Sequence, residues 1–163
     1  MNRFEQLITP HLGVAWRVAR GLTRNDADAQ DILQEACMRA FRYFERFQGD
    51  DARAWLLTIV RHSFYDSLPV GQPLQPLDED DEPMADWSYN PERLAERAEL
   101  RDAVNTALQT LPPAYREAIV LREMADCSYR EIAHISGTPI GTVMSRLARG
   151  RELLLRALTA QEN

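Results

Sequence analysis

Residues 128–151 restrict the fold of this chain more than any other stretch, because they predict two short helices separated by a tight turn. Ser128 and Glu131 have the spacing of a capping box, which predicts that the first helix begins at this point. Gly137 can adopt the left-handed backbone conformation that ends a helix sharply. The segment therefore predicts a helical hairpin with a defined start and a defined turn.

The second helix of this hairpin is expected to begin with Thr138 as its N-cap and Pro139 at its first position. Its later residues separate into two faces at helical spacing. The face expected to pack holds Val143, Leu147, Gly150 and Leu154. The polar, cationic face holds Thr142, Ser145, Arg146 and Arg149. This pattern favours a helix-turn-helix that binds DNA, and the alternative is a surface hairpin with a solvated charged face.

The remaining segments also predict helices, and no stretch has the alternation and turn residues of a β-hairpin. Asn25 or Asp26 can cap a second helix, and Gly49 interrupts the chain before a third. The buried stripe of that second helix is expected to be Ile32, Leu33, Ala36, Cys37, Ala40, Phe41 and Phe44. We predict an all-α fold with two small helical domains, residues 1–68 and 91–163, joined by an extended linker, residues 69–90.

The linker segment is rich in proline and acidic residues, including the run from Asp78 to Glu82. Residues 69–97 hold eight acidic residues and two arginines, which accounts for the whole net charge of −6. Neither end domain is strongly basic, although phosphate neutralisation supplies most non-specific DNA affinity. The charge distribution therefore predicts a DNA-binding protein that works within a larger complex.

Several classes of protein are disfavoured by what the sequence lacks. The N-terminus has no signal-peptide pattern and no apolar run is long enough to span a membrane, so a cytoplasmic protein is expected. No Gly-rich phosphate loop, nucleophile–base pair or metal-ligand spacing is found around His11, His62 and His134, which disfavours an enzyme, a cofactor or a metal site. Cys37 and Cys127 are expected to be buried free thiols, with a redox role as the alternative.

Four segments, taken in order, resemble the extracytoplasmic-function sigma factors of bacterial RNA polymerase. They are residues 28–42 and 47–61 in the N-terminal domain, and residues 111–122 and 141–149 in the C-terminal domain. The resemblance implies that region two binds core RNA polymerase and melts the minus-ten promoter element, while region four reads the minus-thirty-five element. It also implies control by an anti-sigma factor, soluble or membrane-bound, and no small-molecule substrate.

The resemblance assigns the N-terminal residues to two surfaces. A mixed-charge helix face is expected to bind the polymerase, with a solvated face as the alternative. Its residues are Asp28, Asp31, Gln34, Glu35 and Arg39. The minus-ten strand is expected to be held through phosphate contacts and base stacking. The candidates are Arg53, Arg61, His62 and Tyr65, and His62 stands where the family commonly has Asn. Many members have a basic run after the position of Asp66, which is missing here.

The minus-thirty-five candidates lie on the second helix of the helix-turn-helix. Arg146 and Arg149 are expected to contact phosphates. Base edges are expected to be contacted by Thr142, Met144, Ser145 and Ala148. Methionine and alanine can contact a thymine methyl group but cannot form a bidentate bond to guanine, so these residues do not predict the promoter sequence.

Three alternatives remain open at the level of the sequence. The acidic linker is either a solvated tether or a segment whose carboxylates imitate phosphates inside polymerase channels. The chain is an alternative sigma factor, or a sigma-like decoy that binds an anti-sigma factor without initiating transcription, or a free-standing helix-turn-helix regulator. The missing basic run after Asp66 favours the decoy, and the arginines of the second helix favour the sigma factor.

Overall fold

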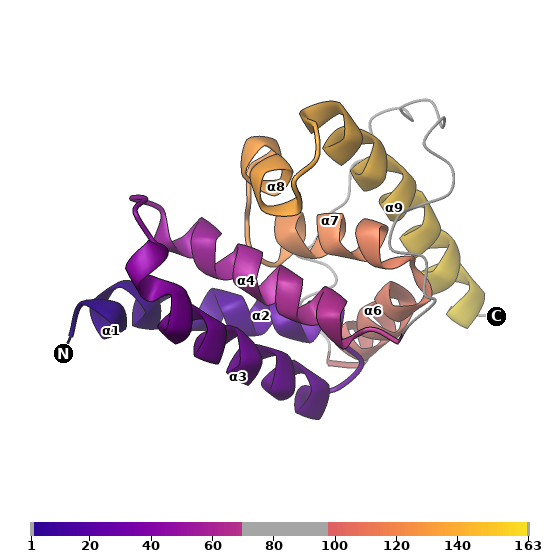
Figure 1. The fold of residues 1–163 in the computed structure, drawn as a ribbon. Coiled ribbons are helices and arrows are strands. Elements are labelled where there is room, and N and C mark those ends of the chain that lie inside the picture. Colours follow the sequence, from indigo (N-terminus) through magenta and orange to yellow (C-terminus); the bar gives the residue numbers. More distant parts are fainter. Residues whose placement is uncertain (1, 70–97, 163) are drawn as a thin grey trace.

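The computed structural model describes residues 2–69 and 98–162, and every regular element within these ranges is a helix (Figure 1). The all-α prediction is therefore confirmed. The N-terminal bundle consists of α1 (Arg3–Ile8), the 3-10 helix η1 (Thr9–His11), α2 (Leu12–Leu22), α3 (Asp26–Tyr43), the 3-10 helix η2 (Phe44–Arg46) and α4 (Ala52–Ser67). The C-terminal bundle consists of α6 (Ala98–Thr110), α7 (Pro113–Glu123), α8 (Tyr129–Ser136) and α9 (Ile140–Glu162).

Short polar side chains start the long helices of the N-terminal bundle. Asn25 caps α3, because its side-chain oxygen accepts a hydrogen bond from the Asp28 amide at 2.8 Å. Asp51 caps α4 in the same way, accepting from the Ala54 amide at 3.0 Å. These bonds satisfy amides that have no acceptor within the helix. The caps set the starts of α3 and α4, which carry both groups of N-terminal candidate residues.

The C-terminal bundle is built around α7, which is buried from Pro113 to Leu121. Its neighbour α9 crosses it closely at Gly150, where an added Cβ would lie 2.9 Å from Ile119 Cδ1. The other neighbours are α8 on the same side and, across the boundary between the bundles, α2. A helix covered on several sides needs apolar residues around its circumference, which explains the run Ala118 to Leu121.

The two bundles pack directly against each other and share one continuous apolar core. Figure 1 shows α4 running beside α7 and α8, with α2 beneath it. The contacts join α2 to α6 and α7, and α4 to α8. Residues 70–90 of the predicted linker, and the expected restart of helix at Pro91, lie outside the described residues.

Two expectations about local structure differ from what is found. Phe41 was predicted to be buried but is 69% exposed, because it lies at the edge of the α3 stripe, where Phe4 of α1 meets its ring edge-on at 5.4 Å between ring centroids. Helix α9 begins at Ile140, one residue after the predicted first position at Pro139. Helix ends commonly shift by a residue between descriptions, so the second difference is small.

Candidate nucleic-acid interface

The first helix and the turn of the helix-turn-helix are built locally as the sequence predicts, whereas α9 begins at Ile140, so that Thr138 is not its N-cap. Ser128 Oγ accepts from the Glu131 amide at 3.0 Å, and Glu131 Oε1 accepts from the Ser128 amide at 3.0 Å. Together these bonds form a complete capping box at the start of α8. Gly137 ends α8 in the left-handed conformation with φ +66°. The start of α8 and the turn that follows it therefore depend on Ser128, Glu131 and Gly137, which lie within ten positions of one another.

Helix α9 places its apolar face as predicted, with Val143, Leu147 and Leu154 almost completely buried. The candidates for base contacts include Met144, which is 50% exposed. Arg149 is half-buried and forms an ion pair with Glu152 at 2.8 Å. These residues occupy the first half of α9, the part that a recognition helix presents to base edges.

Arg146 differs from the expectation of an exposed cationic face, because it is only 7% exposed. It lies close to Glu117 and Ile132, beneath the start of α9. Its position borders the apolar stripe, since it lies between Val143 and Leu147, which are both buried. The other residues that line this position, among them Ala114, Glu117 and Ser136, all belong to α7, α8 or α9, so packing within the C-terminal bundle covers Arg146.

Three of the four candidate minus-ten residues on α4 also contact the C-terminal bundle. Arg53 donates to Glu131 at 2.9 Å and to the Ala125 carbonyl. Arg61 donates through Nε to Glu117 and also lies over the Tyr65 ring, with its Cζ 4.6 Å from the centroid. His62 is the exception, because it is exposed. The cations of α4 therefore face acidic groups of α7 and α8.

Glu117 lies at the centre of this arrangement and is 2% exposed. Tyr65 donates its hydroxyl to Glu117 Oε2 at 2.8 Å. Burial raises the pKa of Glu117, and the positive charges of Arg61 and Arg146 lower it in part. Burial and the neighbouring carboxylate raise the pKa of Tyr65, which keeps its hydroxyl a hydrogen-bond donor at neutral pH. The buried carboxylate of Glu117 therefore accepts hydrogen bonds from Arg61 and Tyr65 of α4 and lies near the positive charge of Arg146 on α9.

Sequence reasoning did not identify Glu117 as a functional residue. The same is true of Arg116, whose buried guanidinium donates to the carbonyls of Leu108, Leu111 and Leu22. The available signal was the placement of two charged residues inside a short helix that is otherwise apolar on most sides. Charged residues are almost never fully buried unless they are paired, so such positions point to a contact with another element.

The candidate polymerase-binding residues on α3 have a different environment. Asp28, Asp31 and Glu35 are exposed, and Gln34 lies among them on the same helix. Arg39 is half-buried and forms ion pairs with Glu35 at 2.9 Å and Asp66 at 2.8 Å. Exposed Met38 and Phe41 lie on the same helix and were not part of the predicted face. The arrangement is an open, mixed-charge surface with an apolar component.

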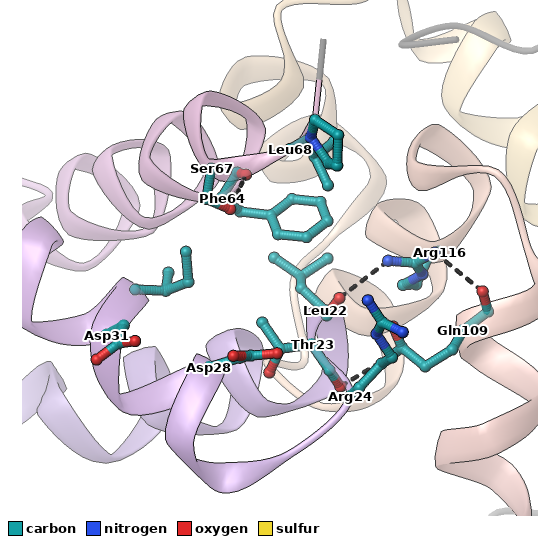
Figure 2. A pocket seen from close by; sticks show the side chains of 12 residues that line it. Leu22, Thr23, Arg24, Asp28, Asp31, Phe64, Ser67, Leu68, Gln109 and Arg116 are labelled. Atoms are coloured by element: carbon teal, nitrogen blue, oxygen red, sulfur yellow. Dashed lines mark hydrogen bonds between the residues drawn. The ribbon is translucent and has the colours of Figure 1, made fainter. Parts of the chain in front are cut away.

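A cleft of about 510 Å³ opens where the two bundles meet (Figure 2). Its lining includes Asp28 and Asp31 of α3, Phe64 of α4 and Arg116 of α7. In Figure 2 the Arg116 side chain reaches across to the Leu22 carbonyl, a hydrogen bond of 3.0 Å. The cleft therefore adjoins the α3 surface and is closed at one end by contacts between the bundles.

Metal sites and membrane-spanning helices are both absent from the part of the chain that the structure describes. Among these residues, no group of histidine, cysteine and acidic side chains could hold a metal ion. No helix in the described ranges is long and apolar enough to cross a membrane. Cys127 is buried and Cys37 is half-buried, and both are free thiols.

The two bundles match two known family models. Sigma-70 region 2 matches residues 7–69, and sigma-70 region 4 matches residues 101–154. The chain is also 36% identical over 138 residues to the ECF RNA polymerase sigma-E factor of Escherichia coli (strain K12), covering 78% of this chain and 72% of that protein. The chain belongs to the extracytoplasmic-function (ECF) sigma factors. The N-terminal bundle is its region two and the C-terminal bundle its region four.

Further comparisons show how far the similarity to other sigma factors extends. The chain is 34% identical over 158 residues to the ECF RNA polymerase sigma factor SigE of Mycolicibacterium smegmatis, covering 94% of this chain and 61% of that relative. The sigma factor RpoE of Bartonella quintana, solved in complex with the anti-sigma factor NepR, has a TM-score of 0.70 at 27% identity over 98% of each chain. CnrH, solved with the cytosolic domain of CnrY, shares the fold, with a TM-score of 0.68 at 24% identity over 96% of this chain and 88% of that one.

Proposed function

We propose that this sigma factor binds core RNA polymerase and directs promoter-specific initiation of transcription. The observation that carries the proposal is the pairing, in one chain, of a region two bundle with an open charged α3 face and a region four bundle with a complete helix-turn-helix. The similarity to ECF RNA polymerase sigma factors extends through both bundles. We propose no catalytic activity, cofactor or small-molecule substrate, and a protein with these partners acts in the cytoplasm.

The proposed roles follow the chemistry of each surface. The exposed acidic and polar residues of α3 dock on the polymerase, where complementary charge sets orientation and speeds association. Arg53, Arg61 and Tyr65 of α4 hold the unpaired minus-ten strand through phosphate contacts and stacking. The first half of α9 enters the minus-thirty-five duplex, where Arg149 binds phosphate and Met144 lies against bases.

An anti-sigma factor is the proposed regulator. RpoE of Bartonella quintana, which resembles this chain over nearly its whole length, was solved in complex with an anti-sigma factor. In this chain the cleft between the bundles offers residues of both bundles to such a partner. Binding there would hold the two DNA-binding bundles in one fixed arrangement.

Run-off transcription with purified core polymerase on a promoter library tests the proposal. The chain is compared with a double variant, Arg146→Ala with Arg149→Ala, and with Arg156→Ala as the matched control. Arg156 lies further along α9, with a side chain 68% exposed. We expect promoter-specific transcripts from the wild type and the control, and fewer from the double variant. Polymerase binding without any transcript would contradict the proposal.

A sigma-like decoy is the second candidate, and one observation favours it. Arg53, Arg61, Tyr65 and Arg146 are all engaged or buried at the contact between the bundles, as expected of a protein that never binds promoter DNA. A decoy would bind an anti-sigma factor and give no transcripts under any condition. The same run-off assay therefore separates the two candidates.

A further inference from the structure

The first half of α9 presents a row of apolar side chains where a recognition helix commonly presents polar groups. Ile140 and Met144 are 42% and 50% exposed, and the half-buried Ala148 continues the row. Residues four apart are neighbours on a helix surface, so these three form one ridge. We propose that region four recognises the minus-thirty-five element through thymine methyl groups, which this ridge contacts in the major groove. The inference rests on the proposed function and names the chemistry of its upstream site.

The arginines that follow Met144 on α9 face acidic groups of the C-terminal bundle. Arg146 is 7% exposed and lies close to Glu117 of α7. The next two form ion pairs, Arg149 with Glu152 at 2.8 Å and Arg151 with Glu123 at 3.4 Å. Guanine is read by an arginine or lysine that directs donors at its O6 and N7 atoms, and the chain has no lysine. The ridge itself therefore offers no donor suited to guanine.

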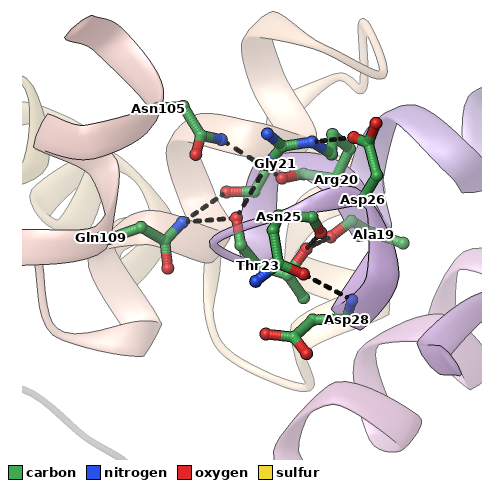
Figure 3. Close-up of polar contacts among 9 residues, drawn as sticks. All are labelled: Ala19, Arg20, Gly21, Thr23, Asn25, Asp26, Asp28, Asn105 and Gln109. Atoms are coloured by element: carbon green, nitrogen blue, oxygen red, sulfur yellow. Dashed lines mark hydrogen bonds and ion pairs between the residues drawn. The ribbon is translucent and has the colours of Figure 1, made fainter. Parts of the chain in front are cut away.

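The side-chain amides of the C-terminal bundle are engaged away from the helix-turn-helix. Asparagine and glutamine read adenine through a paired donor and acceptor, and between residues 98 and 160 they occur only at Asn105 and Gln109 of α6. Asn105 donates to the Arg20 carbonyl at 3.3 Å, and Gln109 donates to the Thr23 carbonyl at 2.9 Å (Figure 3). These amides bond to the end of α2, so the ridge has no amide neighbour with which to read adenine.

The hydroxyl of Ser145, next to Met144, can accept a hydrogen bond from a base but has no hydrogen left to donate. Ser145 Oγ donates its single hydrogen to the Gly141 carbonyl at 3.0 Å. In the major groove the amino groups of adenine and cytosine are the donors, and among the four bases only thymine carries a methyl group. A methyl contact beside a hydrogen-bond acceptor therefore matches an A·T pair and neither half of a G·C pair alone.

The size of the ridge suits a short run of base pairs. Eight residues of helix separate Ile140 from Ala148, which is about 12 Å, or the rise of three to four stacked base pairs. Methionine is flexible and polarizable, so it can adapt to a methyl group at slightly different positions. Removing one methyl group from water against such a surface strengthens binding about fourfold, and two such contacts about fifteenfold.

The test begins with a promoter library whose minus-thirty-five block is randomised. Run-off transcription with core polymerase and the full-length chain selects the active blocks. Each thymine of an active block, on either strand, is then replaced in turn by uracil, which removes the methyl group and keeps the base pair. Fluorescence anisotropy of the labelled duplex measures its affinity for the polymerase–sigma complex. We expect uracil to weaken binding about fourfold at one or two positions.

Substitutions on α9 assign this sensitivity to the ridge. Met144→Ala should remove the difference between thymine and uracil at one position, whereas Met144→Leu should keep it, because leucine retains an apolar side chain of similar size. Leu155→Ala is the matched control: Leu155 is 45% exposed on the same helix, three turns further along, and its loss should leave the difference unchanged. All three changes are at exposed positions, so the variants should fold.

Cytosine and 5-methylcytosine provide the converse measurement. At a position sensitive to uracil, a duplex with 5-methylcytosine should bind about fourfold more tightly than one with cytosine, because the methyl group returns to the same edge of the groove. Equal affinity for thymine and uracil throughout an active block, or active blocks without thymine, would overturn the inference and leave promoter-specific transcription intact. A library that yields no active block would contradict the proposed function, and this inference with it.

Discussion

Helices α3 and α4 are neighbours in the N-terminal bundle, but their candidate residues differ in exposure and in the elements that they contact. The acidic candidates of α3 are exposed, and the ion pairs of Arg39 with Glu35 and Asp66 stay within the bundle. The candidates of α4 are bonded to the C-terminal bundle, except for His62. The proposed polymerase-binding face is therefore open in this structure, whereas most of the proposed minus-ten residues lie in the contact between the bundles.

The largest effect is expected from reversing charge on the open face. Asp31→Arg with Glu35→Arg should weaken polymerase binding about a hundredfold, because each like-charge contact costs on the order of 1.4 kcal/mol or more. The radius of gyration should not change, since both side chains are on the exposed face of α3. Affinity for core polymerase can be measured by fluorescence anisotropy of the labelled chain. Glu5→Arg with Glu45→Arg is the matched control, because both residues lie outside this face.

The next prediction concerns Arg149, the proposed phosphate contact of α9. Arg149→Ala should weaken binding of the polymerase–sigma complex to minus-thirty-five duplex DNA about tenfold, as expected for a charged contact worth about 1.5 kcal/mol. Fluorescence anisotropy of the labelled duplex measures the change. Unchanged affinity would contradict the proposed role of Arg149. Arg156→Ala again serves as the control.

A smaller effect is expected from pH, through Glu117. Burial raises its pKa while the bundles are packed above the ordinary value of 4.5 that it regains when solvated, because removing the carboxylate from water costs more than its pairing with Arg61 and Tyr65 returns. The packed form therefore binds the proton more tightly, so the contact between the bundles is most stable below pH 4.5 and weakens as pH rises through the raised pKa. Scattering across this range should show progressive expansion.

Glu117→Gln provides the control for this pH dependence. The amide has no charge to titrate, but it keeps an oxygen that can accept from the Tyr65 hydroxyl. Its radius of gyration should therefore change less with pH than that of the wild type. An identical pH profile in the two proteins would assign the expansion to other carboxyl groups.

The smallest effect is expected at Gly137, which belongs to neither surface. Gly137→Ala should lower the free energy of unfolding by about 1 kcal/mol, because a residue with a Cβ is disfavoured in the left-handed conformation. A Cβ there would meet no atom within 4 Å, so no clash adds to this cost. Thermal unfolding measures the change, while polymerase affinity should stay the same. A loss of several kcal/mol would contradict this account of the turn.

The features that could be predicted from the sequence are those determined by nearby residues. The capping box of Ser128 and Glu131, the turn at Gly137 and the cap at Asn25 each depend on positions a few residues apart. The buried face of α9 follows from helical spacing alone. The fold class and the helices that carry the two groups of N-terminal candidates therefore follow from local patterns in the chain.

The contact between the bundles could not be predicted in this way. Glu117 and Gly21 are ordinary helical residues until α4 and α7 are placed next to them. Arg146 was expected on the polar face because helical spacing does not show how far α7 and α8 extend over a border position of α9. Phe41 was misassigned for the complementary reason, since helical spacing does not show that its edge of α3 stays largely exposed beside Phe4 of α1.

The pairing of Arg53 and Arg61 with acidic groups of the C-terminal bundle has a consequence for how the chain meets DNA. A chromosome offers an excess of non-promoter sites to any protein with accessible phosphate-binding arginines. Two arginines fewer are accessible to such sites while Glu131 and Glu117 hold them.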